Sequence, residues 1–272
     1  MKRNVVILIV TLLLAGTVMQ AQTYMAIGDS LAFGFQQDKF VSELLSGTYD
    51  PANFNTGYVD VFGTILRNSL PNLKTVNFSC PGETTTTLAV GGCPFHNSLI
   101  ALPLHQSYPG STPQLRAAVD YLQAHPSEVL LITLTIGAND LLNVISGCNR
   151  DARCVQQALP GLMNNAGTAL QTEIAILKTV SPQTLVLYTN VPNPYLYSNP
   201  DLDASFASFN QAMQAKANSA GAKNVDWYSV EKQYDSATLC LLTFVCTAPT
   251  YDIHPTDLGY RLLGYHTALA LQ

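Results

Sequence analysis

The sequence predicts an α/β domain: a three-layer α/β/α sandwich around a central parallel sheet of roughly five strands. Short apolar runs alternate with longer segments of helical periodicity, which is the pattern of βαβ units. Residues 129–136 are apolar almost throughout, as expected for a central strand covered on both faces. About 250 residues remain after a leader-like start, a length that one such domain accommodates.

The expected elements follow in order along the chain. Pro71 ends the first long helix, Gly221 stops the fourth, and Thr256 is a good N-cap for the last. Residues 88–112 are rich in Gly, Pro, Ser and His and predict a long loop. The expected strands are 24–27, 73–78, 129–136, 184–188 and 225–228; the expected helices are 56–70, 113–124, 155–180, 201–220 and 256–271.

The first 21 residues have the composition of a signal peptide. Lys2 and Arg3 precede an apolar run over residues 5–14, and small residues lead to Ala21. The run is short for a membrane span, so a retained anchor is the weaker alternative. We therefore predict a signal peptide over 1–21, a mature domain over 22–272 without a membrane span, and a secreted or periplasmic location.

Charge and cysteine content limit the classes of partner and cofactor. The chain has 13 basic and 18 acidic residues and no basic run, so nucleic acid is not an expected partner. Six cysteines in an exported chain predict three disulfides. A metal site is the alternative, but no Cys-x-x-Cys or suitably spaced His supports it, and we expect no metal or cofactor. Of the 15 possible pairings, the sequence-local one is favoured: Cys80–Cys93, Cys148–Cys154 and Cys240–Cys246.

Small or polar residues follow three of the predicted strands. Ser30, Gly82 and Asn139 each come after a strand, and right-handed crossovers place those strand ends on one edge of the sheet. Ester hydrolysis needs a nucleophile, a base and donors for the oxyanion. Ser30 can attack, His254 can take its proton, and the Ser30 and Gly82 N–H groups with the Asn139 amide can form an oxyanion hole.

These stretches resemble the SGNH, or GDSL-type, esterase/lipase superfamily. Gly28-Asp29-Ser30-Leu31 matches its first block, Gly82 the glycine of its second, Gly137-Ala138-Asn139-Asp140 its third and His254-Pro255 its fifth. The resemblance spans residue 24 to the C-terminus. It implies a flavodoxin-like sheet, an SGNH-type hydrolase domain over 22–272, and hydrolysis of esters without a metal.

The group that orients His254 departs from the family pattern. The family has Asp three residues before this His, where this chain has Tyr251; Asp252 lies only two residues before. Either Asp252 orients the imidazole through an altered turn, or a backbone carbonyl such as that of Tyr251 does so. The first reading gives a triad and the second a dyad.

The substrate is the least determined property. Residues 241–245 are apolar, lie between two cysteines and precede the His254 block, so we expect Leu242 or Phe244 to form an acyl-binding wall. Such a wall predicts a lipase-like preference for short to medium acyl esters over acetate. The alternatives are a carbohydrate acetylesterase and a non-catalytic glycan-binding relative. The sequence leaves the oligomeric state open.

Overall fold

The five strands form one parallel sheet, as expected from the sequence. The computed structural model describes residues 22–98, 101–247 and 252–272. The strands are β1 (Thr23–Gly28), β2 (Lys74–Asn77), β3 (Val129–Thr135), β4 (Leu185–Thr189) and β5 (Lys223–Val225). Their spatial order is β2-β1-β3-β4-β5, so the direction of winding reverses between β1 and β3. In open α/β sheets, ligands bind beyond the strand ends at such a switch point.

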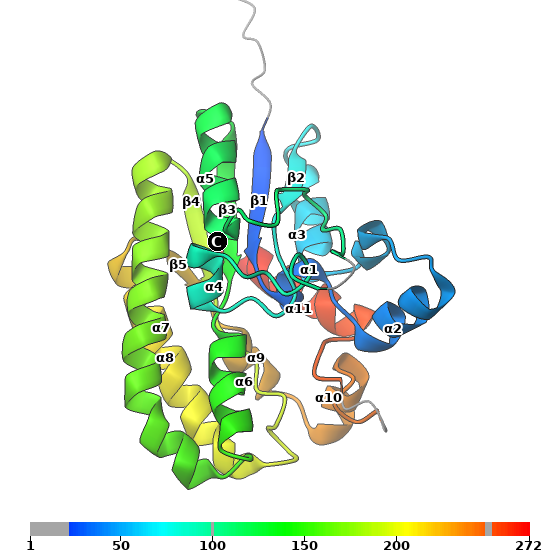
Figure 1. Cartoon of the computed structure of the whole chain (residues 1–272), viewed down its shortest axis with the longest axis vertical. Helices are drawn as coiled ribbons and strands as arrows, with labels where there is room; N and C mark the ends of the chain where they lie inside the picture. Colours follow the sequence, from blue (N-terminus) through cyan, green and yellow to red (C-terminus); the bar gives the residue numbers. More distant parts are fainter. Residues whose placement is uncertain (1–21, 99–100, 248–251) are drawn as a thin grey trace, which may run out of the picture.

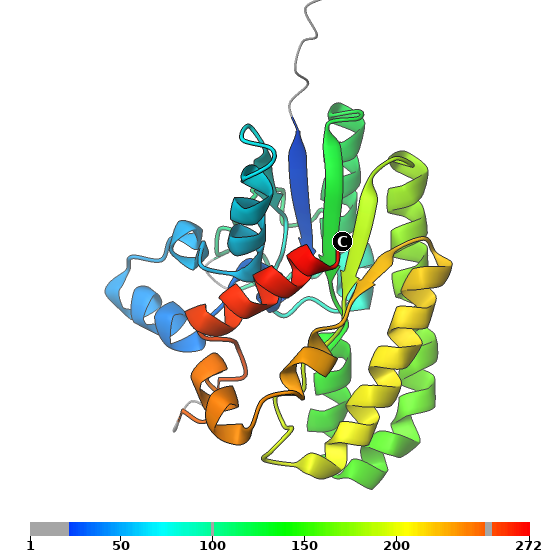
Figure 2. The same cartoon turned by 180° about the vertical axis from the view of Figure 1, so that it is seen from behind.

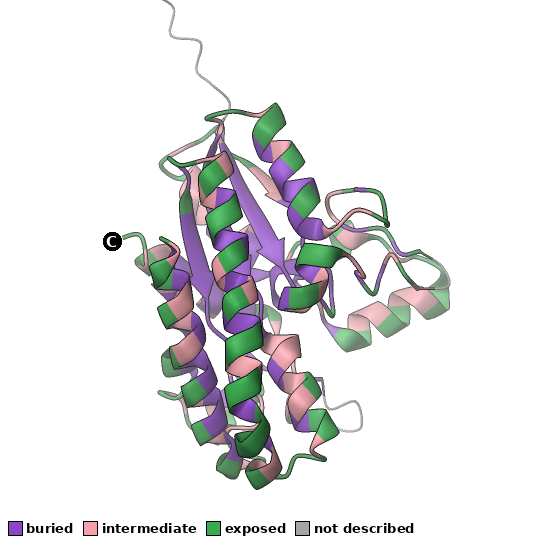
Figure 3. Ribbon diagram, turned by 60° about the vertical axis from the view of Figure 1, so that its left-hand side comes forward, coloured by how far each residue is buried: buried purple, intermediate pink, exposed green. Residues whose placement is uncertain are grey.

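Helices cover both faces of the sheet and complete the three layers (Figures 1 and 2). One face packs against α5 (Gln114–Ala124), α7 (Ala152–Val180) and α8 (Asp203–Ser219). The other packs against α3 (Tyr58–Arg67) and α11 (Asp257–Leu269). Strand side chains alternate between the two cores: Met25 and Ile27 enter the first, Tyr24 and Ala26 the second. Figure 3 shows the buried strands between helices whose outer surfaces are exposed.

Several short helices were not expected from the sequence. They are α1 (Ser30–Phe33), α2 (Gln37–Ser46), α4 (Thr85–Val90), α6 (Ala138–Gly147), α9 (Trp227–Glu231) and α10 (Ser236–Leu242), with 3₁₀ turns at Pro51–Phe54 and Pro200–Leu202. Helix α4 begins within a threonine run because Thr84 and Thr87 form a reciprocal capping box. The expected strand over 225–228 is partly wrong, since the Asp226 side chain caps α9 by accepting from the Ser229 N–H.

The structure has the three sequence-local disulfides, and no described cysteine is free. Helix α7 starts earlier than expected because Asp151 caps it. It continues through Pro160, which is exposed to solvent. The predicted signal peptide lies outside the described residues. Within those residues, none of the helices combines the length and the apolar character needed to cross a bilayer.

Candidate active site

Ser30 lies where β1 ends, next to the switch point of the sheet. Gly28 has φ +145°, and a Cβ there would lie 2.0 Å from the Thr135 carbonyl oxygen, so only glycine allows β1 this close to β3. Asp29 is buried and caps α1, because its Oδ1 accepts from the Leu31 N–H at 3.0 Å. Ser30 is therefore the first residue of a short helix held firmly at the strand end.

His254 faces Ser30 although the two are far apart in sequence. Its Nε2 lies 2.8 Å from Ser30 Oγ, and its side chain is only 13% exposed. The Phe35 ring stands edge-on to the imidazole, with ring centroids 4.9 Å apart. The His254 carbonyl accepts from the Phe244 N–H at 2.9 Å, so the backbone after α10 supports the histidine. This is the contact that a nucleophile and its base require.

Asp252 completes the arrangement on the far side of the imidazole. Its Oδ1 lies 2.5 Å from His254 Nδ1, and its Oδ2 accepts from the Gln37 N–H at 2.8 Å. Burial acts to raise the pKa of the Asp252 carboxyl, but the hydrogen bonds from His254 and Gln37 hold it below its ordinary value. The altered turn thus brings Asp252 to the imidazole. The alternative acceptor, the Tyr251 carbonyl, lies outside the described residues.

The segment that follows Ser30 holds the histidine block in place, a feature that the sequence did not reveal. Gln36 is buried, and its Nε2 donates to the Pro255 carbonyl at 3.3 Å and to Asp257 Oδ1 at 2.9 Å. The Tyr260 hydroxyl donates to the Phe35 carbonyl at 2.8 Å. Residues 35–37 therefore connect α1, which begins at Ser30, to the region of His254.

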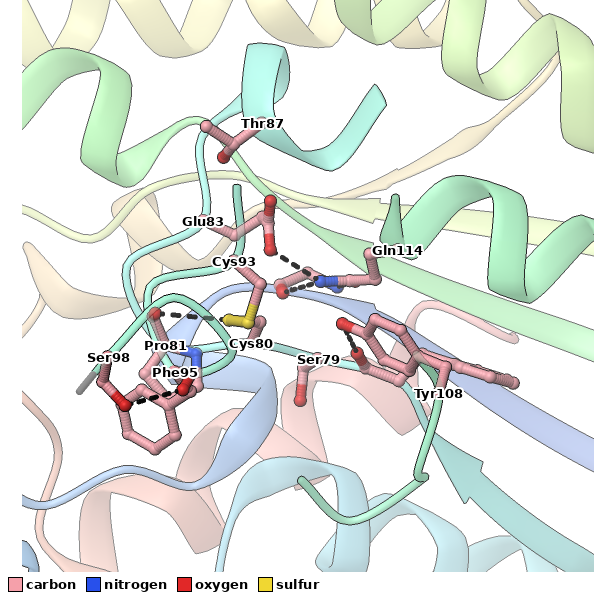
Figure 4. Close-up of a disulfide and its surroundings, with 12 residues drawn as sticks. Ser79, Cys80, Pro81, Glu83, Thr87, Cys93, Phe95, Ser98, Tyr108 and Gln114 are labelled. Atoms are coloured by element: carbon pink, nitrogen blue, oxygen red, sulfur yellow. Dashed lines mark hydrogen bonds between the residues drawn. A yellow bond between two sulfur atoms is a disulfide. The ribbon is translucent and has the colours of Figure 1, made fainter. Parts of the chain in front are cut away.

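Gly82 lies in a tight turn that leaves its N–H unused. The Glu83 N–H donates to the Cys80 carbonyl at 3.2 Å, and Gly82 has φ +84° after Pro81, which is the pattern of a type II turn. The Cys80–Cys93 disulfide ties this turn to the following loop (Figure 4). Within the described part of the chain, the N–H groups of Ser30 and Gly82 donate to no acceptor.

Asn139 stands in the first turn of α6, which the sequence did not predict as a helix. One hydrogen of its side-chain amide goes to the Glu83 carbonyl at 2.8 Å, and the amide has a second to offer. Gly137, with φ +110°, redirects the chain from β3 into the helix. Ser30, Gly82 and Asn139 line one cavity.

Gln114 joins two of these parts and was missed by the sequence analysis. This residue is 1% exposed; its Oε1 accepts from the Gly28 N–H at 2.6 Å, and its Nε2 donates to the Gly28 carbonyl at 3.0 Å. The same Nε2 lies 3.3 Å from Glu83 Oε2 (Figure 4). A polar residue at a buried position of α5, directly after Pro113, was the available signal.

Three acids adjoin Ser30, Gly82 and Asn139 in the sequence: Asp29 and Glu83 are buried, and Asp140 is half-buried. Burial raises the pKa of Asp29 and of Glu83 to about 7, and it raises the pKa of Asp140 as well. Asp140 accepts from both the N–H and the hydroxyl of Thr85, at 2.9 and 2.7 Å. Cys80, Glu83 and Cys93 are close enough to share an ion, but the two sulfurs form a disulfide and offer no thiolate.

The cavity beside Ser30 has a volume of about 310 Å³ and mostly apolar walls. Its apolar lining includes Phe35, Phe95, Leu142, Val191 and Ile253. The expectation that Leu242 or Phe244 faces this cavity is wrong.

Leu242 ends helix α10 and instead lines a smaller neighbouring cavity with residues of α11. The adjoining chain contributes through its backbone: Thr243 forms an isolated β-bridge with Pro255, and the Phe244 N–H bonds the His254 carbonyl. The loop lies near the rim, as expected, but it positions the histidine and does not supply the apolar wall.

The fold and the site define a class: a doubly wound α/β protein with Ser, His and Asp side chains in contact at the switch point. The chain belongs to the GDSL-like Lipase/Acylhydrolase family, whose model matches residues 26–262. This membership supports an ester hydrolase at the level of the family. No protein with a curated description matches the chain.

Solved structures of related folds cover nearly the whole chain. A lipase from a goat rumen metagenome is 20% identical, with a TM-score of 0.55, over 92% of this chain and 97% of its own. An extracellular lipase from Streptomyces rimosus is 18% identical, with a TM-score of 0.57, over 92% and 98%. A catalytic mutant of an acetylxylan esterase from Geobacillus stearothermophilus is 13% identical, with a TM-score of 0.55, over 93% and 94%. At these identities, the similarity establishes the fold.

Proposed function

We propose that this protein is an exported serine ester hydrolase in which Ser30 is the nucleophile, His254 the base and Asp252 the group that orients it. One observation carries the proposal: His254 stands between Ser30 Oγ, at 2.8 Å, and Asp252 Oδ1, at 2.5 Å, at the wall of a cavity. A serine next to a base that is itself oriented by a third group is the signature of an activated nucleophile.

In the proposed acylation step, the Ser30 hydroxyl attacks the ester carbonyl while His254 Nε2 takes its proton. The carbonyl oxygen becomes an oxyanion, and the Ser30 N–H, the Gly82 N–H and the Asn139 amide donate to it. Each such donor is typically worth about 3–4 kcal/mol in the transition state. The imidazolium then protonates the departing alcohol, and an acyl-serine remains.

Deacylation repeats the chemistry with water as the nucleophile. His254 takes a proton from the water, the same donors hold the second oxyanion, and Ser30 leaves with its hydroxyl restored. Throughout, Asp252 keeps Nδ1 protonated, so that Nε2 is free to accept. The anchoring of Asp252 by the Gln37 N–H supports a triad over a dyad.

The apolar cavity supports short to medium acyl esters as substrates. Each additional buried CH₂ contributes about 0.8 kcal/mol, or roughly fourfold in kcat/KM, until the cavity is full. Leu142 lies in this lining, whereas Leu241 is 67% exposed outside it. Leu142→Ala should therefore weaken the preference for longer chains, and Leu241→Ala is the matched control.

Two other functions stay open on the same scaffold. A carbohydrate acetylesterase is the alternative enzyme, and one structure of similar fold is an acetylxylan esterase. A non-catalytic glycan-binding protein is the alternative outside enzymes. The direct contact between Ser30 and His254 argues against a non-catalytic binding protein, because binding alone does not need a serine hydroxyl next to a base.

We infer export from the leader-like residues 1–21 and from three disulfides, which persist in oxidising compartments. N-terminal sequencing of the protein recovered outside the cytoplasm tests this proposal. A mature chain starting at Gln22 would support it, and an intact Met1 would contradict it.

The enzyme itself is tested by labelling with a fluorophosphonate and by rates on acetyl, butyryl and octanoyl esters of one alcohol, beside acetylated glycans. We expect labelling, and kcat/KM that rises from acetyl to butyryl. Ser30→Ala should remove the label and lower kcat on the order of 10⁴-fold or more with the fold retained. Ser30→Ala within tenfold of wild type would refute the nucleophile, and a preference for acetylated glycans would favour the acetylesterase.

A further inference from the structure

One polar side chain in the wall of the Ser30 cavity has no part in the chemistry proposed above. The polar side chains that line the cavity are those of Ser30, Asn139, His254 and Glu231. The first three belong to the proposed machinery. Glu231, the last residue of α9, is 9% exposed and shares an otherwise apolar part of the wall with residues such as Val191 and Pro192.

Only one of the two carboxyl oxygens of Glu231 is occupied. Oε2 accepts from the Asn193 N–H at 2.5 Å. Oε1 bonds no group among the residues that the structure describes, and Glu231 pairs with no Lys or Arg there. The adjacent Lys232 turns away and pairs with Asp203 at 2.8 Å. Oε1 keeps some exposed surface, so a donor group in the cavity, from a ligand or from water, can reach it.

We propose that Glu231 is a substrate-binding residue that accepts a hydrogen bond from a hydroxyl group of the ester. This inference rests on the proposed function of the cavity. A hydroxyl fits the site better than a cation, because bringing a second charge between apolar walls costs far more than bringing in a neutral group. Burial raises the pKa of Glu231 to about 7, so near neutrality the carboxyl can also donate to the hydroxyl oxygen.

A purely structural role is the competing explanation, in which Glu231 only holds the Asn193 loop. An amide oxygen would serve that purpose without the cost of a buried acid. Residue 231 also lines the smaller cavity behind the wall, together with Pro192 and Pro255, which are shared by both cavities. Glu231 therefore borders two cavities.

The experiment compares matched esters with and without free hydroxyl groups. Glycerol monobutyrate, which has two free hydroxyls, against propyl butyrate places hydroxyls in the alcohol, and methyl 6-hydroxyhexanoate against methyl heptanoate places one in the acyl part. We expect wild type to prefer the hydroxylated member of one pair by about 10- to 100-fold in kcat/KM. The pair that shows the preference identifies which half of the ester reaches Glu231.

Two variants separate recognition from structure. Glu231→Leu should abolish the preference while propyl butyrate or methyl heptanoate is hydrolysed within about threefold of wild type. Glu231→Gln keeps the size of the side chain and an acceptor, and it should retain part of the preference. This variant tests the proposal if the leucine variant does not fold. Equal rates on both members of each pair in wild type would overturn the proposal, as would a leucine variant that loses both members equally.

Two further outcomes are distinct from these. Butyrylcholine hydrolysed faster than glycerol monobutyrate by wild type would overturn the choice of a hydroxyl in favour of a cation. Failure of wild type to hydrolyse any ester, without labelling by a fluorophosphonate, would refute the proposed enzyme and with it the basis of this inference.

Discussion

Replacing Asp252 by Asn tests whether the site is a triad. The change keeps the size of the side chain, so the turn and the contact with the Gln37 N–H can persist through the remaining oxygen. However, an amide NH₂ placed at the position of Oδ1, 2.5 Å from His254 Nδ1, meets a ring nitrogen that should itself donate. The tautomer with the proton on Nε2 then becomes the stable one, and Nε2 can no longer accept from Ser30.

The magnitude follows from losing the base while keeping the rest of the site. A wrong tautomer removes general-base assistance, which in comparable triads costs about 10⁴-fold in kcat. Substrate binding in the apolar cavity does not involve Asp252, so KM should change by less than about threefold. The assay is kcat and KM on a butyryl aryl ester, with circular dichroism and thermal melting to show that the fold is retained.

A matched control is available five residues along the chain. Asp257 accepts from Gln36 Nε2 at 2.9 Å and belongs to the same block, but its carboxyl does not contact the imidazole. Asp257→Asn should stay within about threefold of wild type in kcat. A loss of tenfold or less in a folded Asp252→Asn would refute the triad and point to a dyad supported by a carbonyl.

The other predictions concern the donors, their supports and the buried acids. Asn139→Ala should lower kcat by about 10²–10³, and an unchanged kcat would remove this amide from the oxyanion hole. Gln114→Leu, which leaves the Gly28 peptide without its partners, should lower kcat about tenfold and also lower Tm; an effect on Tm alone would make it merely structural. Replacing Cys80 and Cys93 by Ala should cost about 3 kcal/mol, with activity lost at lower denaturant than the core signal, whereas coincident loss would contradict a local role. Burial raises the pKa of Glu83 to about 7, so the folded state binds more protons than the unfolded state between about pH 4.5 and 7, and stability should fall as the pH rises through that range. Glu83→Gln should flatten the dependence of Tm on pH there. An unchanged slope would be evidence against the raised pKa.

The sheet, and the proximity of the candidate site residues, could be predicted from the sequence because their signals are local. A buried strand followed by a glycine and a candidate site residue occurs at Ser30 and at Asn139, and crossover handedness brings such ends together. The sequence-local disulfides follow from the same proximity along the chain. Asp252 could be named as a candidate but not settled, since its contact depends on the path of a turn.

The remaining features depend on contacts between distant segments. Gln36 and Gln114 act through bonds to residues between 31 and 221 positions away, which no pattern of spacing reveals. Leu242 was misplaced for the same reason. Its apolar character is correct for burial, but residues 236–242 form a helix, and that helix turns Leu242 toward α11 and away from Ser30.

Three acids adjoin the proposed oxyanion donors in the sequence. Asp29 precedes Ser30, Glu83 follows Gly82 and Asp140 follows Asn139, and hydrogen bonds hold each acid to the neighbouring backbone or to Gln114. Among the described residues, none of these acids has a Lys or Arg partner.

An ionised carboxylate at any of these positions would repel the negative charge that develops on the ester oxygen. Burial raises the pKa of Asp29 and of Glu83 to about 7, so a proton can remain on these two carboxyls and reduce that repulsion, and burial raises the pKa of Asp140 as well. The same hydrogen bonds fix the strand ends from which the donors project, and electrostatic stabilisation of this kind depends on donors that do not reorganise. Burying acids without a basic partner costs free energy. That cost falls at the proposed site, where a rigid and weakly charged frame favours the chemistry, as expected because folds depart from their usual packing rules at functional sites.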